Sequence, residues 1–86
     1  MRTYFRNLNT MRVKYIVFKN DQAIIFGEDW AHSDFTRFME PASAGFVSIN
    51  GSERTATCYG ESVSLKLKSD TERDSRIVTR ILFPEL

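Results

Sequence analysis

The chain's single histidine stands in the segment His32-Ser33-Asp34, which holds the three residue types of a hydrolytic triad. A triad also needs a positioned nucleophile, and the sequence has no G-x-S-x-G turn that would supply one. One histidine without partnering cysteines does not match the ligand spacing of a zinc site. We therefore expect His32 to shape a loop or contact a ligand, and we expect no enzyme, no metal and no cofactor.

A second group of chemically useful side chains lies in the segment Ser62–Lys68. If it forms a strand, its serines and lysines share one face and its valine and leucines share the other. Hydroxyl and cationic donors beside an aromatic ring suit a phosphate-bearing ligand. The alternative is a solvated polar face that binds nothing. The candidate ligand-binding residues are Tyr59, Ser62, Ser64, Lys66 and Arg76, with His32 and Ser43 as contributors from the preceding loops.

Five strands and two helices must position these residues. β-branched and aromatic runs bounded by turn residues predict strands over Val13–Phe18, Ala23–Phe26, Ala44–Ile49, Thr55–Tyr59 and Ser62–Lys68. Asn50-Gly51 favours a tight turn because both residues tolerate a positive φ. Gly60 interrupts the strand pattern and predicts a bulge or bend.

The helical segments are separated by the later strands. Ser33 is the expected N-cap of a short helix, Asp34–Glu40, whose apolar face holds Phe35, Phe38 and Met39. A capping box of Ser69 and Glu72 begins a longer helix that ends before Pro84. The predicted fold class is α+β: a small antiparallel sheet of four to five strands, one short helix, and a C-terminal helix packed on the sheet.

Length and charge limit the choice of partners. The 86 residues predict one domain over 1–86, with 1–11 as a possible N-terminal arm, and the net charge is only +1. We expect no nucleic-acid partner, because any basic site must be a local patch. No apolar run is long enough for a membrane span, no export signal is evident, and Cys58 is alone, so we expect a cytoplasmic protein.

The hairpin Val13–Phe26 is apolar on both faces, so both faces must be covered. A second layer or a second subunit would supply that cover. We therefore predict a homo-oligomer, most simply a symmetric dimer or a multiple of one.

Four sequence blocks together resemble a group of small uncharacterised proteins of phage and prophage genomes. The blocks are Tyr15-Ile16-Val17-Phe18, His32-Ser33-Asp34, Ser43-Ala44-Gly45-Phe46-Val47 and Cys58-Tyr59-Gly60-Glu61-Ser62-Val63-Ser64-Leu65. The resemblance covers roughly residues 15–82 and implies a phage setting without supplying a function. By analogy, one hypothesis is a non-enzymatic binding protein that sequesters a nucleotide-like signal and so antagonises host defence. The other is an interaction module that inhibits or adapts a host or phage protein.

Overall fold

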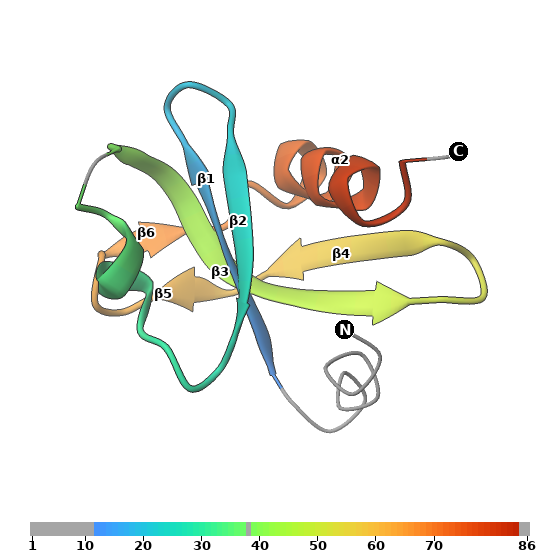
Figure 1. The fold of residues 1–86 in the computed structure, drawn as a ribbon, viewed down its shortest axis with the longest axis horizontal. Coiled ribbons are helices and arrows are strands. Elements are labelled where there is room, and N and C mark those ends of the chain that lie inside the picture. The colour runs from blue at the N-terminus through green and yellow to red at the C-terminus, as the bar shows by residue number, and fades with distance from the viewer. Residues whose placement is uncertain (1–11, 38, 85–86) are drawn as a thin grey trace.

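The computed structural model describes residues 12–37 and 39–84, so the predicted arm at 1–11 lies outside the described residues. The fold confirms the predicted α+β class (Figure 1). Its elements are β1 (Val13–Phe18), β2 (Ala23–Gly27), the 3-10 helix η2 (His32–Phe35), β3 (Pro41–Asn50), β4 (Thr55–Tyr59), β5 (Glu61–Ser62), β6 (Leu67–Lys68) and α2 (Thr71–Leu82).

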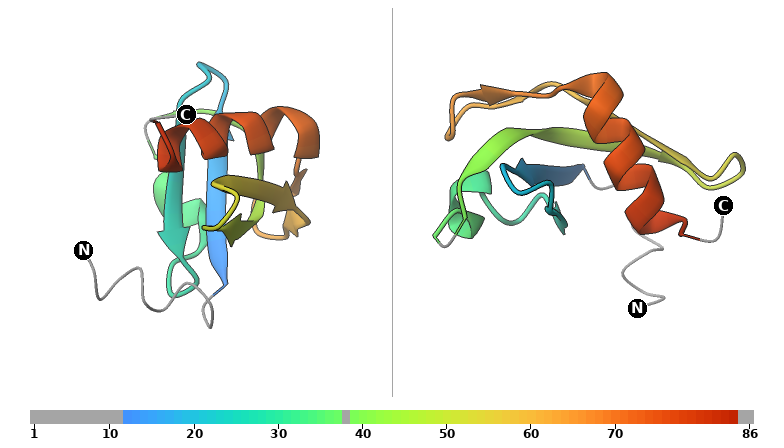
Figure 2. Two further views of the ribbon diagram at one scale, coloured as in Figure 1. Left: turned by 90° about the vertical axis from the view of Figure 1, so that its right-hand side faces the viewer. Right: turned by 90° about the horizontal axis from the view of Figure 1, so that it is seen from above.

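Four strands form one antiparallel sheet in the order β2-β1-β3-β4, and β5 and β6 form a second, two-stranded sheet. One face of the larger sheet packs against α2, which crosses the strands in Figure 2, and Tyr15, Val17, Cys58 and Val78 are buried there. The opposite face buries a second cluster around Ile16 and Phe18, against which side chains of η2 and the β5–β6 region pack. Two small cores therefore lie on opposite faces of β1.

The cover of the β1–β2 hairpin comes from the chain itself. Helix α2 lies on one face, while Phe35, Met39, Leu65 and Leu67 pack on the other. The apolar character of both faces therefore does not require a second subunit.

The short helix is smaller than predicted and begins earlier. The described segment holds a single 3-10 turn over His32–Phe35 instead of a helix over Asp34–Glu40, and Ser33 lies inside it and does not cap it. The Asp34 carboxylate accepts a hydrogen bond from the Ala31 amide at 2.8 Å, which fixes the start of this turn. Of the predicted apolar face, Phe35 and Met39 pack on the sheet, and Phe38 lies outside the described residues.

The predicted strand Ser62–Lys68 is wrong, because the chain reverses within it. β5 pairs with β6 antiparallel, and the turn between them places Lys66 at a φ of 57°. The Ser62 hydroxyl accepts a hydrogen bond from the Leu65 amide at 3.2 Å and closes this turn. The predicted faces therefore fail: Ser62 is buried, and Val63, expected in the core, is 82% exposed.

Helix α2 starts and ends near the predicted positions, but its cap differs. Asp70 is the N-cap, and its side chain accepts a hydrogen bond from the Arg73 amide at 3.3 Å. Ser69, predicted as the cap, instead donates its hydroxyl to the Ala44 carbonyl at 3.4 Å. The cap is thus one residue later than the sequence pattern indicated.

Two glycines hold positions that a residue with a side chain would not readily occupy. Gly60 adopts a φ of +79° where the chain leaves the larger sheet, which confirms the predicted bend. A side chain at Gly45 would collide with the Ser69 hydroxyl and the Tyr59 carbonyl, so β3 can pass these groups only with glycine there. The turn after Asn50 is longer than predicted: its strands rejoin at Asn50 and Thr55, and the positive φ falls on Arg54.

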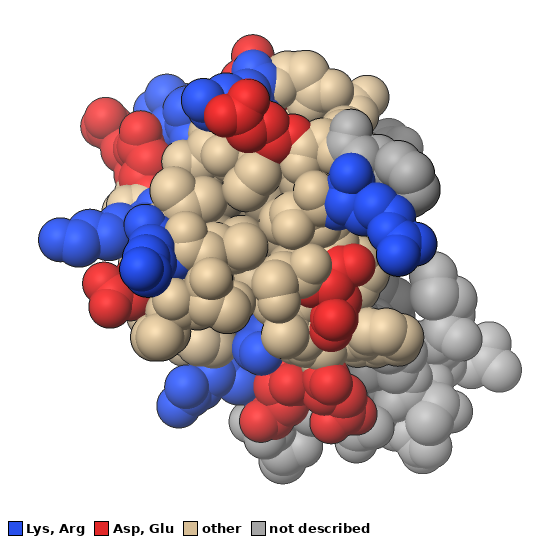
Figure 3. Space-filling view, turned by 90° about the vertical axis from the view of Figure 1, so that its left-hand side faces the viewer, with Lys and Arg blue, Asp and Glu red and all other residues tan. Residues whose placement is uncertain are grey.

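Charges are mixed over the surface. Figure 3 shows acidic and basic side chains around an uncharged area on the side that carries η2 and β6. No single sign dominates that face, in keeping with the net charge of +1. Among the described residues, no helix has the length and apolar character needed to cross a membrane.

Candidate functional site

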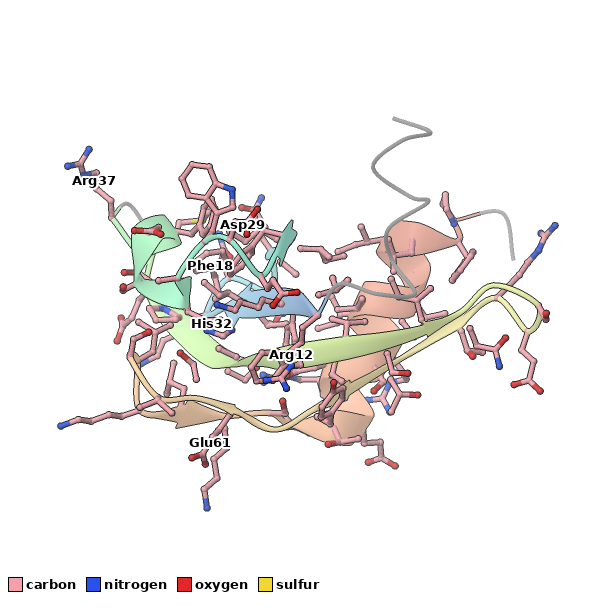
Figure 4. The ribbon with its side chains drawn as sticks, turned by 90° about the horizontal axis from the view of Figure 1, so that it is seen from below. Arg12, Phe18, Asp29, His32, Arg37 and Glu61 are labelled. Carbon is pink, nitrogen blue, oxygen red and sulfur yellow. The ribbon has the colours of Figure 1, made fainter. Side chains whose placement is uncertain are left out.

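A groove of about 630 Å³ opens where the start of β1, the start of η2, β3 and the β4–β5 bend meet. We call it the cationic groove. It is lined by Arg12, Lys14, Ala31, His32, Phe46, Tyr59, Gly60, Glu61, Val63 and Ser64. Arg12, His32 and Glu61 are labelled in Figure 4.

Cross-strand register creates the central row of the groove. Lys14 on β1 is paired with Phe46 on β3, and Phe46 is paired with Tyr59 on β4. Directly paired residues on neighbouring antiparallel strands place their side chains on the same face of the sheet. A cation and two aromatic rings are therefore adjacent on one face although 45 positions of sequence separate Lys14 from Tyr59.

The aromatic rings form one wall. The Phe46 and Tyr59 ring centroids are 5.9 Å apart with an interplanar angle of 33°, and Tyr59 is 45% exposed. The Arg12 guanidinium carbon lies 4.9 Å from the Phe46 ring centroid, in the range of a cation–π contact. A planar ligand can stack on the exposed Tyr59 ring beside a positive charge.

Hydrogen bonds hold the backbone of Arg12 and the ammonium group of Lys14. The Arg12 amide donates to the Glu28 carboxylate at 3.0 Å, and the Lys14 ammonium donates to the Trp30 carbonyl at 2.7 Å. The Trp30 carbonyl accepts a hydrogen bond from one of the three ammonium N–H groups, which leaves two that can donate to an anion. Glu61 is the one carboxylate among the lining residues, so the groove has an excess of positive charge.

His32 forms the floor and is only 4% exposed. Its Nε2 lies 2.9 Å from the Gly45 carbonyl oxygen, and its ring meets the edges of Phe26 and Phe46 at centroid distances of 5.5 Å and 6.0 Å. Burial lowers the pKa of His32, and the nearby charge of Lys14 lowers it further, although the bond to Gly45 acts in the opposite direction. The imidazole is therefore neutral at pH 7.

Three of the seven predicted site residues meet in this groove: His32, Tyr59 and Ser64. Ser62 and Lys66 do not line the groove, although they are close to Ser64 in the sequence. Ser62 is buried and closes the β5–β6 turn, and Lys66 lies exposed in that turn.

The remaining two predicted residues lie elsewhere. Arg76 lines a separate hollow of about 720 Å³ between α2 and the β1–β2 turn. Ser43 is buried and accepts a hydrogen bond from the Arg73 guanidinium at 2.9 Å, so its hydroxyl serves the packing of α2. The structure thus divides the predicted site among the groove, a turn and the helix.

The sequence interpretation missed Arg12, Lys14, Phe46 and Glu61. Lys14 carried a usable signal, because it is the one charged residue within the apolar run Val13–Phe18. Phe46 lies four residues before Asn50 and Tyr59 lies four residues after Thr55, which is the spacing of paired residues in a hairpin whose strands meet at Asn50 and Thr55. Neither signal reveals that β1 lies beside β3, and this neighbourhood assembles the groove.

Two other buried polar groups have structural partners. The Asp74 carboxylate is 0% exposed and accepts hydrogen bonds from the Tyr15 hydroxyl, the Asp70 amide and the Arg73 guanidinium. Burial raises the pKa of the Cys58 thiol to about 12, with a further contribution from the Asp74 charge. A thiol with such a pKa is a poor nucleophile at neutral pH.

Within the described residues, no cluster of three or more histidine, cysteine, aspartate or glutamate side chains could hold a metal ion. No family model, curated protein or solved structure matches this chain. The geometry of the groove is therefore the basis for the functional proposal.

Proposed function

We propose that this protein is a binding module that captures a small nucleotide-like anion in the cationic groove without transforming it. The observation that carries the proposal is the row Lys14–Phe46–Tyr59, which places a cation beside an aromatic wall, with Arg12 at the same wall. Phosphate oxygens would accept from Lys14 and Arg12, and the base would stack on Tyr59. The sequence resembles small proteins of phage and prophage genomes. In an infected host, such capture would lower the concentration of a defence signal.

The expected affinity of one subunit is modest. Two charge-assisted hydrogen bonds contribute about 3–6 kcal/mol and one stacked base about 1–3 kcal/mol. Association costs at least ~4 kcal/mol, so an open groove would bind with a Kd on the order of 10 mM at the centre of these estimates. Effective sequestration therefore requires closure of the groove, and we propose that a second copy of the chain supplies it in a homo-oligomer.

Nuclear magnetic resonance titration tests the binding proposal at this affinity. Amide shifts of labelled protein would be followed against a panel of linear and cyclic nucleotides, with light scattering on the same samples for subunit number. Lys14→Ala should weaken binding about tenfold or more, since it removes a charge-assisted bond of about 1.5–3 kcal/mol. Lys66→Ala is the matched control, because Lys66 is an exposed lysine that does not line the groove. Absence of shifts in groove residues at tens of millimolar nucleotide would refute the proposal.

A second candidate function is protein interaction through the outer edge of β2. Among the described strands, β2 has a neighbour only on one side. The opposite edge strand, β4, is closed by α2, because Thr79 bonds the Ala56 amide and carbonyl and Ser75 bonds the Cys58 amide. Open edges accept a partner strand. Slowed amide exchange of β2 when labelled protein is placed in host lysate, with unchanged exchange in β4, would favour this function over nucleotide capture.

A further inference from the structure

His32 has one ring nitrogen committed to the fold and one that is free. The Gly45 carbonyl can only accept a hydrogen bond, so the neutral ring must carry its proton on Nε2. Nδ1 then holds a lone pair and acts as an acceptor. No described residue donates to it.

The free nitrogen belongs to a residue that lines the groove. Every buried side-chain nitrogen or oxygen of the described residues has a hydrogen-bond partner. Nδ1 has none, so it is an accessible atom of a side chain that is otherwise 96% buried, and His32 lines only the cationic groove among the pockets described. An uncharged acceptor is therefore held rigidly on the groove floor.

The position of this acceptor relative to the other groups matches the order of parts in a nucleotide. The His32 ring centroid is 6.0 Å from that of Phe46, on the aromatic wall proposed for the base. It is also close enough to Lys14, proposed for the phosphate, for that charge to act on the imidazole. Between base and phosphate a nucleotide carries its sugar, whose hydroxyl groups can donate.

We propose that His32 Nδ1 accepts a hydrogen bond from a ribose hydroxyl, so that the groove selects ribonucleotides over analogues that lack the sugar hydroxyls. This inference rests on the proposed function, because it assigns the sugar of the same bound ligand. The selectivity has a physical cause: a dideoxy analogue removes Nδ1 from water and gives it no donor in return.

The test compares two ligands that differ only in these groups, adenosine monophosphate and its 2′,3′-dideoxy analogue. Wild-type protein should bind the ribonucleotide about tenfold more tightly, the ratio expected for one neutral hydrogen bond. His32→Gln keeps an amide donor for the Gly45 carbonyl but replaces the fixed imidazole acceptor with an amide oxygen at a different position. In this variant the ratio of the two affinities should fall toward one, because comparing the two ligands in both proteins isolates the hydroxyl–Nδ1 pair.

A direct readout on wild-type protein avoids any effect of substitution on folding. The ¹⁵N resonance of His32 Nδ1 should move when the ribonucleotide binds and stay in place when the dideoxy analogue binds. Equal affinities of wild type for both ligands, or a ratio that persists in His32→Gln, would overturn the hydroxyl assignment. If both ligands bind equally and Lys14→Ala weakens both, nucleotide capture stands and the sugar assignment alone fails. If neither ligand binds, both proposals fail.

Discussion

The Tyr15 hydroxyl on β1 donates a hydrogen bond of 2.5 Å to the Asp74 carboxylate on α2, and both side chains are 0% exposed. This contact joins the centre of the sheet to the helix across 59 positions of sequence. The same carboxylate oxygen accepts from the Asp70 amide, so the buried charge also stabilises the first turn of α2. Burial and the bond to Asp74 raise the pKa of Tyr15, which keeps its hydroxyl protonated as a donor.

The first prediction concerns this pair. Asp74→Ala should lower the free energy of unfolding by about 3–5 kcal/mol, because it leaves buried donors without their acceptor. Tyr15→Phe should cost about 1–3 kcal/mol, since Asp74 keeps its other donors. Urea unfolding of both single variants and the double variant measures the coupling. Asp29→Ala, an exposed carboxylate, is the control and should change stability by less than about 0.5 kcal/mol. Additive losses in the double variant would contradict a direct interaction.

A second prediction concerns the reactivity of Cys58, the only cysteine of the chain. Its thiol is buried, and its pKa is raised to about 12, so little thiolate forms at pH 8 in the folded protein. Reaction with a disulfide reagent should therefore follow the unfolded fraction and accelerate steeply with urea. Ser52→Cys in a Cys58→Ser background places the thiol at an exposed position and should react at once. Rapid labelling of wild type without denaturant would show that the site opens locally.

The sequence pattern predicted those elements whose side chains follow a simple burial rule. β4 was predicted with the bounds Thr55–Tyr59 that the structure has, and β1 with the bounds Val13–Phe18. The segment Ser62–Lys68 has a strand-like alternation, but the alternation does not exclude a turn closed by a serine hydroxyl and a residue of positive φ. Local pattern alone does not distinguish these outcomes.

The candidate site was less predictable than the fold, because long-range pairing assembles it. His32 and Tyr59 were identified by residue type, yet Lys14 joins them only through the order β2-β1-β3-β4. A different neighbour for β1 would give the same strand pattern and place Lys14 elsewhere. Conversely, Arg76 was assigned to the site from its residue type, although α2 packs on the other face of the sheet.

The third prediction is a dependence of stability on pH through His32. Its pKa is lower in the folded protein than the ordinary value of 6.5, so the unfolded chain binds the proton more readily. This contribution to stability is fully present above about pH 6.5 and is lost as the pH falls through the lowered pKa. Urea midpoints of wild type should therefore decline over this range more steeply than those of His32→Gln. Equal slopes for the two proteins would show that another group causes any decline.

A fourth prediction concerns the closure of the β4 edge. Thr79 accepts from the Ala56 amide at 2.9 Å and donates to the Ala56 carbonyl at 3.1 Å. Thr79→Val keeps the side-chain shape but leaves both backbone groups unpaired, so it should cost about 1–3 kcal/mol of unfolding free energy. Thr79→Ser retains the hydroxyl and should cost less. Thr57→Val, on an exposed position of the same strand, is the control. Amide exchange at Ala56 should accelerate in Thr79→Val only, and unchanged exchange there would contradict the proposed closure.

The last prediction separates conformation from binding at Lys66. Its φ of 57° is a left-handed conformation that costs a residue with a side chain roughly 1–2 kcal/mol. Glycine adopts this conformation freely but loses more entropy on folding, so Lys66→Gly should raise the unfolding free energy by up to about 1 kcal/mol. Lys68→Gly, in the adjacent strand β6, should instead lower it by about 0.5–1 kcal/mol. Urea unfolding measures both effects, and the same samples can be titrated with nucleotide. Because Lys66 does not line the cationic groove, Lys66→Gly should leave nucleotide affinity unchanged. A loss of affinity without a loss of stability would place the ligand over the β5–β6 turn instead of at Lys14.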